Sequence, residues 1–377
     1  MFQLSKSSKM RKQYIHLILI ILISSQSQMF TQSGFKVMEI DNSEYPKMKS
    51  NYYLFDQLGL PIRNLKINDF VVRDNGVNVK SITNHYCDAT NYDTTKLSVT
   101  LSFDLALNTD GDFNNFELGK RLSKNIASKI DYNEISLVSY NIRTYLNREF
   151  TDTLDYILSE INNFNPDIGS LFNTTFLDEP ANVFKIISRA NYKKIIILIT
   201  DGSGNIEENL INTLADDNNI KIYSLVIGKK IPESLKRITI KSGGIFIDNI
   251  NPNIDFDLIS NIINAHGKGY LPCQLDWESD YSCTEEHYIN VSIPSLSLKD
   301  SLLIDFPNLE KSSIIADPSF LGFSSVDSGK TKKLSLTITA KNRDIFIQEL
   351  KINQPFTIIE GNVSNYLLLK DNFLNNN

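Results

Sequence analysis

The sequence predicts a doubly wound α/β domain that is flanked on both sides by all-β modules. Between residues 96 and 266, apolar strand-like runs alternate with amphipathic helical runs. Residues 35–92 and 267–377 instead alternate apolar and polar residues between Gly, Pro and Asn turns, without a helical period. The hydrophobic content of 41% is too high for a disordered chain. A multidomain globular protein is therefore expected.

The first 28 residues have the pattern of a secretory signal peptide. Four basic residues precede "YIHLILIILI", and the small polar run "SSQSQ" follows. A spanning helix needs about twenty apolar residues, so no stable membrane span is expected after cleavage. We expect a secreted, periplasmic or cell-surface protein. The net charge of −6 and the thinly spread Lys and Arg exclude nucleic acid and anionic membrane as partners.

Residues 35–92 form a β-rich segment in which "DQLG" and "DNG" are hairpin signals. Residues 267–310 are also strand-like. Each segment is too short for a sandwich by itself, so we expect the two to pack together around an inserted α/β domain.

Residues 96–266 contain the α/β domain. Its strands are rich in Ile and Val and read as buried on both faces, which predicts a mostly parallel sheet. The expected strands are "KLSVTLSF", "EISLVSY", "KKIIILIT", "IKIYSLVIG" and "GIFID". The expected helices include "FELGKRLSKNIASKI", "DTLDYILSEINNF", "ANVFKIISRA", "EENLINTLADD", "PESLKRITIKSG" and "IDFDLISNIINAHG".

Residues 311–377 read as a β-sandwich module. From Ser312 onward there are about five strand candidates, whereas a sandwich of the immunoglobulin type has about seven. We expect this module to be incomplete in the sequence, or completed by a strand from a partner.

The cysteines permit one short disulfide in an oxidising compartment. Cys273 and Cys283 would close a loop around "QLDWESDYS", which leaves Cys87 buried or paired elsewhere. A metal site built from these thiols is disfavoured because no C-x-x-C occurs and His85 is a single neighbour of Cys87.

Two strands of the α/β domain end in a carboxylate, Asp104 after "VTLSF" and Asp201 after "IIILIT". Ligands bind at the carboxyl edge of a doubly wound sheet, and paired carboxylates suit a hard cation. The alternative is that each Asp caps a turn. A second acidic run follows at residues 108–117, but Phe113 stands where an EF-hand needs Gly. This run therefore reads as a solvated loop before a helix capped by Asn114 or Asn115.

These motifs resemble the von Willebrand factor type A domain, which is Rossmann-like, over about residues 96–266. The resemblance is carried by "LSFDLALN", "NTTFLDEPANVF" and "IIILITDGSGN". The metal-ion-dependent adhesion site of the family uses Asp-x-Ser-x-Ser, a Thr and an Asp. Asp104 and Asp201 match, Thr175 matches better than Thr174, and the two Ser positions fall on Ala106 and Asn108.

The resemblance implies a degenerate metal site of Asp104, Asn108, Thr175 and Asp201. Asn offers an amide oxygen, but Ala106 offers no ligand, so Mg²⁺ or Ca²⁺ would bind weakly or not at all. The flanks resemble those of secreted bacterial proteins of this type, with a looser likeness to an Ig-like module at the carboxyl end.

The expected function is that of an exported binding or adhesion protein. It would recognise a protein or cell-surface ligand at the carboxyl edge of the sheet. The alternatives are a structural or assembly component that binds neither metal nor ligand, and a weakly metal-dependent adhesin. No enzyme is expected, since the chain has no G-x-S-x-G, no phosphate-binding G-x-x-x-x-G-K-[ST] and only scattered His residues.

Overall fold

The computed structural model describes most of the chain from residue 33 onward. The described ranges are 33–88, 96–107, 114–169, 171–178, 180–204, 206–280, 286–305, 313–341, 345–349, 357, 364–368 and 373–376. The expected signal peptide, Asn108 and Cys283 lie outside these ranges. The described residues fall into two compact units. The first lies within Met1–Val72, Lys80–Glu278 and Asn290–Ser301, and the second within Arg73–Val79, Ser279–Ile289 and Leu302–Asn377.

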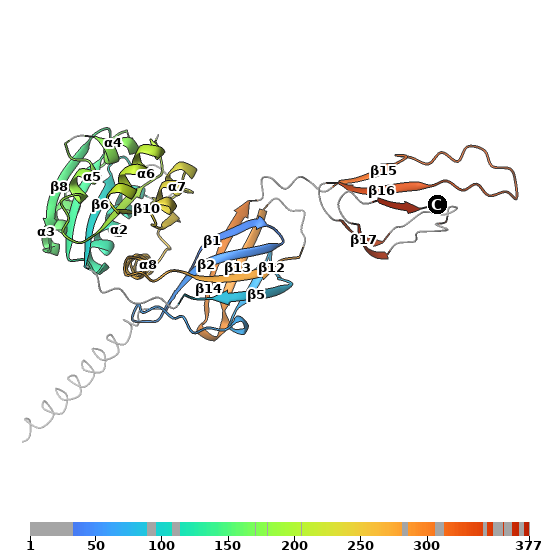
Figure 1. The fold of residues 1–377 in the computed structure, drawn as a ribbon, viewed down its shortest axis with the longest axis horizontal. Coiled ribbons are helices and arrows are strands. Elements are labelled where there is room, and N and C mark those ends of the chain that lie inside the picture. Colours follow the sequence, from blue (N-terminus) through green and yellow to red (C-terminus); the bar gives the residue numbers. More distant parts are fainter. Residues whose placement is uncertain are drawn as a thin grey trace, which may run out of the picture. The chain divides into compact units, whose positions relative to one another are not determined.

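The α/β domain of the first unit is built on a six-stranded mixed sheet, in the order β11-β10-β9-β6-β7-β8 (Figure 1). All neighbouring strands are parallel except β7 and β8, which are antiparallel. The strands are β6 (Leu97–Asp104), β7 (Glu134–Tyr140), β8 (Thr144–Thr151), β9 (Lys193–Thr200), β10 (Lys221–Ile227) and β11 (Phe246–Ile250). The predicted α/β class is confirmed, and the edge strand β8 is an addition to the prediction.

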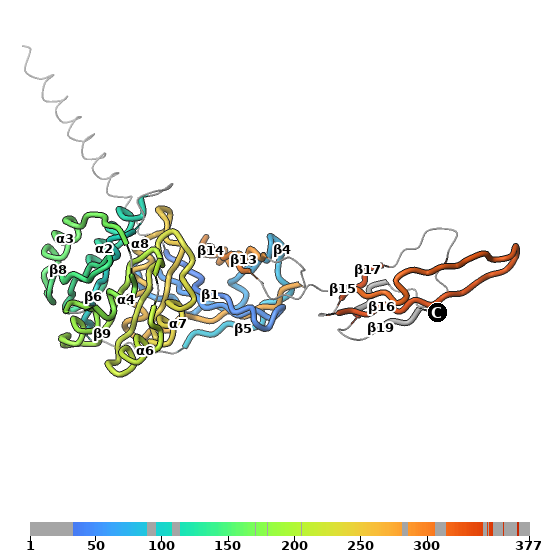
Figure 2. Tube along the Cα trace, turned by 90° about the horizontal axis from the view of Figure 1, so that it is seen from above, coloured from blue at the N-terminus to red at the C-terminus, as the bar shows by residue number. Residues whose placement is uncertain are grey.

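Helices cover both faces of this sheet because successive side chains of a buried strand point to opposite faces. On β9, Ile195, Ile197 and Ile199 pack with α2, α3 and α8, whereas Ile196 and Leu198 pack with α4 to α7. Helices α6 and α7 run side by side on that second face (Figure 2). The helices are α2 (Asn115–Lys129), α3 (Leu154–Asn162), α4 (Phe172–Leu177), α5 (Val183–Ile187), α6 (Glu208–Asp217), α7 (Glu233–Lys241) and α8 (Phe256–Gly267).

Asn114 caps α2, as the residue pattern predicts, and its side chain accepts a hydrogen bond from the Glu117 backbone N–H. No helix in the described ranges is both long enough and apolar enough to cross a membrane.

A separate antiparallel sheet joins segments that precede and follow the α/β domain. Its order is β1-β2-β12-β5 (Figure 1). Strand β12, which follows the α/β domain in the sequence, therefore lies between β2 and β5, which both precede that domain. The strands are β1 (Gly34–Glu44), β2 (Lys47–Phe55), β5 (Ser81–Tyr86) and β12 (Cys273–Glu278). A further sheet has the order β14-β13-β3-β4. It comprises β3 (Val71–Asp74), β4 (Val77–Asn78), β13 (Glu286–Ile293) and β14 (Leu298–Asp305), and 3-10 turns lie at Ile67–Asp69 and Pro294–Leu296.

The disulfide joins Cys87 to Cys273, so the expected pairing of Cys273 with Cys283 is wrong. The strand register explains the difference. Gln274 of β12 lies opposite Tyr86 of β5, and the next antiparallel pair outward is Cys273 with Cys87. Their Cα atoms are 4.3 Å apart. The two cysteines are 186 residues apart in the sequence, so local spacing could not predict that they are neighbours.

The described residues from Ser313 onward contain strands joined by turns and irregular segments, with no helix among them, and all lie in the second unit. Their sheets have the orders β15-β16-β19 and β17-β18, and a small core contains Ile338, Ala340, Ile347 and Leu368. The strands are β15 (Ser313–Asp317), β16 (Leu336–Lys341), β17 (Ile345–Glu349), β18 (Ser364–Leu368) and β19 (Phe373–Asn376).

Candidate functional site

Asp104 is the last residue of β6, and its side chain is fully buried at the carboxyl edge of the six-stranded sheet. Its Oδ1 accepts a hydrogen bond from the Ala106 backbone N–H at 2.9 Å. Its Oδ2 accepts hydrogen bonds from the Thr200 hydroxyl at 3.0 Å and from the Tyr140 hydroxyl at 3.3 Å. These three donors satisfy both carboxyl oxygens, so the buried polar group is fully hydrogen-bonded.

Asp201 follows β9, the strand beside β6, and it is 6% exposed. Its Oδ1 accepts the Ser203 backbone N–H at 2.9 Å. Its Oδ2 forms an ion pair with Nζ of Lys229 at 3.0 Å, and the same ammonium lies 3.3 Å from the Ser203 hydroxyl. Lys229 follows β10, the next strand along the sheet. The cation beside Asp201 is therefore part of the chain itself.

Tyr140 ends β7 and links the two carboxylates electrostatically. Burial raises the pKa of its phenol well above the ordinary value, and the nearby charges of Asp104 and Asp201 raise it further. Because the phenol stays neutral, it is a permanent hydrogen-bond donor to Asp104. Asp104 and Asp201 lie in the same neighbourhood because β6 and β9 are adjacent parallel strands and Thr200, next to Asp201, donates to Asp104.

Thr175 lies on α4 beside the buried face of β6. Its hydroxyl is 2.7 Å from the hydroxyl of Ser102, two residues before Asp104 on the same face of the strand. Thr174 stands apart from this contact, and its carbonyl accepts the Thr144 hydroxyl at 2.6 Å. Ala106 contributes only its backbone N–H. Of the residues in the expected metal site, the structure thus brings Asp104, Asp201 and Thr175 to one edge, and Asn108 is not described.

Among the described residues, the donor set at this edge does not fit a divalent cation. Both oxygens of each carboxylate already accept hydrogen bonds, and the Lys229 ammonium occupies one oxygen of Asp201. A metal needs oxygen lone pairs directed at it, and Ala106 supplies none. Elsewhere in the described part of the chain, His85, Cys87 and Cys273 are grouped closely enough to hold a metal ion, in the β1-β2-β12-β5 sheet.

Large apolar side chains are exposed on two loops at the same edge. Ile142 follows β7 and is 59% exposed, whereas Ile168 and Leu171 precede α4 and are 85% and 46% exposed. The loops are tied together because the Leu171 N–H donates to the Asn141 carbonyl, and Gly169 approaches Ile142 closely enough that a Cβ would lie 2.8 Å from it. These three residues are called the apolar rim below.

The sequence analysis missed Lys229, Tyr140 and the apolar rim. Lys229 was visible in "VIGKKIP" directly after a predicted strand, at the edge where Asp104 and Asp201 were expected. A lysine at that position is a signal that a carboxylate at this edge can be paired within the chain. The rim residues lie in short loops, where isolated apolar residues carry no periodic signal.

The family model of the von Willebrand factor type A domain matches residues 112–258. The chain therefore contains a von Willebrand factor type A domain. No curated protein matches the chain in sequence.

Solved structures of low sequence identity are also similar. BatB from Bacteroides thetaiotaomicron, a conserved hypothetical protein, is 15% identical, with 46% of this chain and 100% of that chain covered and a TM-score of 0.37. The von Willebrand factor domain of the type V pilus tip protein Mfa5 from Porphyromonas gingivalis is 13% identical, with 45% and 96% covered and a TM-score of 0.35. A zinc-occupied proximal thread matrix protein 1 from the mussel byssus is 18% identical, with 52% and 50% covered and a TM-score of 0.35.

Proposed function

Because the chain contains a von Willebrand factor type A domain, we propose that it is an exported, non-enzymatic binding protein. Its ligand would be a protein or a cell-surface component, recognised at the carboxyl edge of the six-stranded sheet. Export is proposed from the signal-peptide pattern of residues 1–28. Localisation would be secreted, periplasmic or at the cell surface.

The apolar rim is the observation that carries this proposal. Clustered large apolar side chains on a protein surface mark contact sites, whereas single exposed ones are ordinary. The rim lies on loops fixed to the domain, because the Asp167 N–H donates to the Leu105 carbonyl and the Asn141 side chain donates to the Asp167 carboxylate at 2.5 Å. A rim held in place loses little conformational entropy on binding.

Ligand binding at this edge would be independent of divalent metal. Lys229 supplies the positive charge beside Asp201 from within the chain. Without a bound dication, this edge offers no open coordination position to an acidic ligand group. A neutral, apolar or basic ligand surface is therefore favoured.

No catalytic role is proposed for these residues. Asp104 and Thr175 are 0% exposed, and their polar atoms hydrogen-bond within the protein. A general base must reach a substrate proton, and a nucleophile must reach its target.

A structural or assembly role is the second candidate. The closed hydrogen-bond network around Asp104 favours it, because such a network also stabilises a domain that binds nothing. A weakly metal-dependent adhesin is less well supported, since Lys229 already neutralises Asp201.

Binding of the labelled full chain to intact producing cells tests the proposal. The variant Ile142→Ser/Ile168→Ser removes the apolar rim, and the control Leu210→Ser/Ile240→Ser removes side chains of 45% and 49% exposure from α6 and α7. We expect saturable binding that weakens at least about tenfold, or about 1.4 kcal/mol, in the rim variant only. Equal binding by the rim variant would contradict the site, and an absence of saturable binding by the unmodified chain would favour the structural role.

A further inference from the structure

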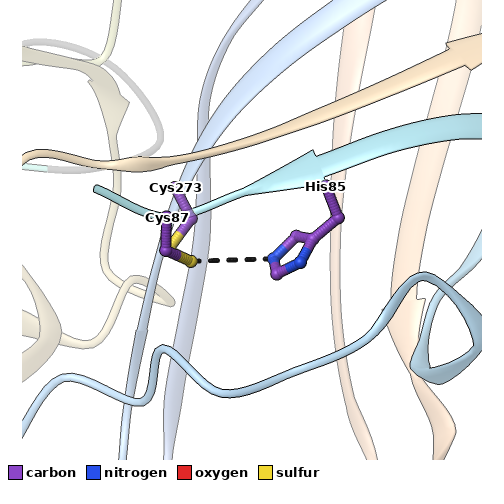
Figure 3. Close-up of side chains that lie close together, drawn as sticks. All are labelled: His85, Cys87 and Cys273. Atoms are coloured by element: carbon purple, nitrogen blue, oxygen red, sulfur yellow. Dashed lines mark hydrogen bonds between the residues drawn. A yellow bond between two sulfur atoms is a disulfide. The ribbon is translucent and has the colours of Figure 1, made fainter. Parts of the chain in front are cut away.

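A second cluster of reactive side chains lies in the β1-β2-β12-β5 sheet, outside the binding edge. His85 is on β5, Cys87 follows that strand, and Cys273 begins β12 (Figure 3). One ligand atom from each residue, the two Sγ atoms and a ring nitrogen, lies within 4.8 Å of the others. Nε2 of His85 is 3.6 Å from Sγ of Cys87.

The strand pairing places these groups on one face of the sheet. His85 and Cys87 are two residues apart, so their side chains leave the sheet on the same side. Cys273 lies on the neighbouring strand β12, where it pairs with Tyr52 of β2 on one side and is bonded to Cys87 on the other. Cys273 is 3% exposed, whereas His85 and Cys87 are partly buried.

Two aromatic rings hold the His85 ring in orientation. It packs against Phe70, at a centroid distance of 5.2 Å, and against Tyr52, at 6.0 Å. An imidazole whose orientation is fixed by its neighbours is pre-organised to coordinate a metal.

We propose that His85, Cys87 and Cys273 form a zinc site when the Cys87–Cys273 disulfide is reduced. In a tetrahedral Zn²⁺ site, bond lengths of about 2.3 Å to sulfur and about 2.0–2.1 Å to nitrogen separate the S and N ligands by about 3.6 Å. The Cys87–His85 separation of 3.6 Å already has this value. The two sulfurs must move to about 3.8 Å apart, which rotation of the two side chains achieves after the S–S bond is broken.

The change from disulfide to zinc site takes two steps, reduction and metal binding. A dithiol reductant gives two electrons and two protons to the disulfide, which yields two cysteine thiols and an oxidised reductant. Zn²⁺ then binds as the two thiols lose their protons, which leave to solvent. The disulfide and the metal are therefore mutually exclusive states of the same sulfurs. With three protein ligands, the fourth position of the ion remains open to water.

Tyr52 competes with the metal for His85. Its hydroxyl lies 2.6 Å from Nε2, the same ring nitrogen that is 3.6 Å from Sγ of Cys87. This hydrogen bond must break before Nε2 can bind Zn²⁺. Removing the hydroxyl should therefore free Nε2 and strengthen metal binding.

Cobalt binding to the full chain tests the site, because Co²⁺ substitutes for Zn²⁺ and reports its ligands by absorption. The parent protein carries Cys283→Ser, which removes the remaining cysteine, and it is reduced with a phosphine under argon. We expect one Co²⁺ per chain, with a thiolate-to-cobalt charge-transfer band and intense visible bands of a tetrahedral site. Without reduction, neither band should appear.

Single changes in the reduced parent assign the ligands. Cys87→Ser should weaken Co²⁺ binding and lower the charge-transfer intensity per bound cobalt by about half, because one of two thiolates is lost, and His85→Ala should weaken binding at least about tenfold. Tyr52→Phe should tighten binding at unchanged stoichiometry. The reduced parent is itself the folding control for Cys87→Ser, since both lack the disulfide. The proposal is overturned if the reduced parent shows no charge-transfer band, or if His85→Ala binds Co²⁺ as tightly as the parent.

Discussion

At the scale of single residues, Lys229 sets the charge beside Asp201 at the carboxyl edge of the six-stranded sheet. It is 54% exposed along its side chain, whereas its partner Asp201 is 7% exposed, so the pair lies at the boundary between protein and solvent. Solvent screening limits such a pair to at most about 1 kcal/mol of stability. Its larger effect is to exclude a metal ion from Asp201, because a metal can bind Oδ2 of Asp201 only if the Lys229 ammonium moves away.

Restoring the missing serines should therefore not be enough to restore metal binding. We expect Ala106→Ser/Asn108→Ser to melt at the same temperature with and without excess Mg²⁺. Adding Lys229→Gln should make Mg²⁺ stabilise the domain, by about 2.7 kcal/mol at one hundred times the dissociation constant. Lys241→Gln, an exposed change on α7, is the matched control for lost charge. A Mg²⁺ shift in the two-serine variant would show that Lys229 does not block the site.

His266 gives the fold a predictable dependence on pH. Burial lowers its pKa from 6.5 to about 3, with the charges of Lys221 and Lys193 as smaller causes, and its Nδ1 is 2.8 Å from the Tyr223 hydroxyl. Since protonation is easier in the unfolded chain, this group stabilises the fold above pH 6.5, and the stabilisation is lost as pH falls toward 3. Between pH 7 and pH 5 the loss should be about 2 kcal/mol.

Urea unfolding of the full chain at these two pH values measures this effect. His266→Asn keeps a polar atom near Tyr223 without the titration, so its free energy of unfolding should change less between pH 7 and pH 5. An unchanged difference would mean that His266 is not the group responsible.

At the scale of elements, the periodicity of apolar residues predicted most of the α/β domain. It failed for a strand that is only partly buried and for contacts between residues far apart in the sequence. Strand β9 was evident because "IIILIT" is buried on both faces. Strand β8 was missed because "TYLNREFT" is an edge strand with mostly half-exposed residues, so its sequence is polar. Asp104 and Asp201 were predictable because each stands at the end of an apolar strand. The ion pair of Lys229 with Asp201 was not predictable, because it depends on β10 being the neighbour of β9, and local spacing in the sequence does not give the order of strands.

The sheet β1-β2-β12-β5 provides a direct test of strand pairing. Digestion of the unreduced protein should yield one disulfide-linked pair of peptides that contain Cys87 and Cys273. Its reduction should lower the free energy of unfolding by about 2–4 kcal/mol, because the bond closes a long loop. A linked peptide pair of Cys273 and Cys283 would contradict the register of β12 against β5.

At the scale of the whole molecule, the α/β domain lies in the chain between the strands of one sheet. Tyr53 and Phe55 of β2 belong to the same buried cluster as Ile259 and Ile262 of α8, so packing is shared across that boundary within the first unit. We propose on this basis that residues 35–92 and 267–310 form one module around the 96–266 domain. The module of residues 311–377 is proposed as a separate β module.

The central claim is that the carboxyl edge binds its ligand with Lys229 in place of a metal ion. Binding of the labelled full chain to producing cells, measured in EDTA and again in excess Mg²⁺ and Ca²⁺, tests it most directly. The account predicts the same dissociation constant in both conditions, together with loss of binding in Ile142→Ser/Ile168→Ser. Binding that disappears in EDTA and returns with Mg²⁺ would contradict it.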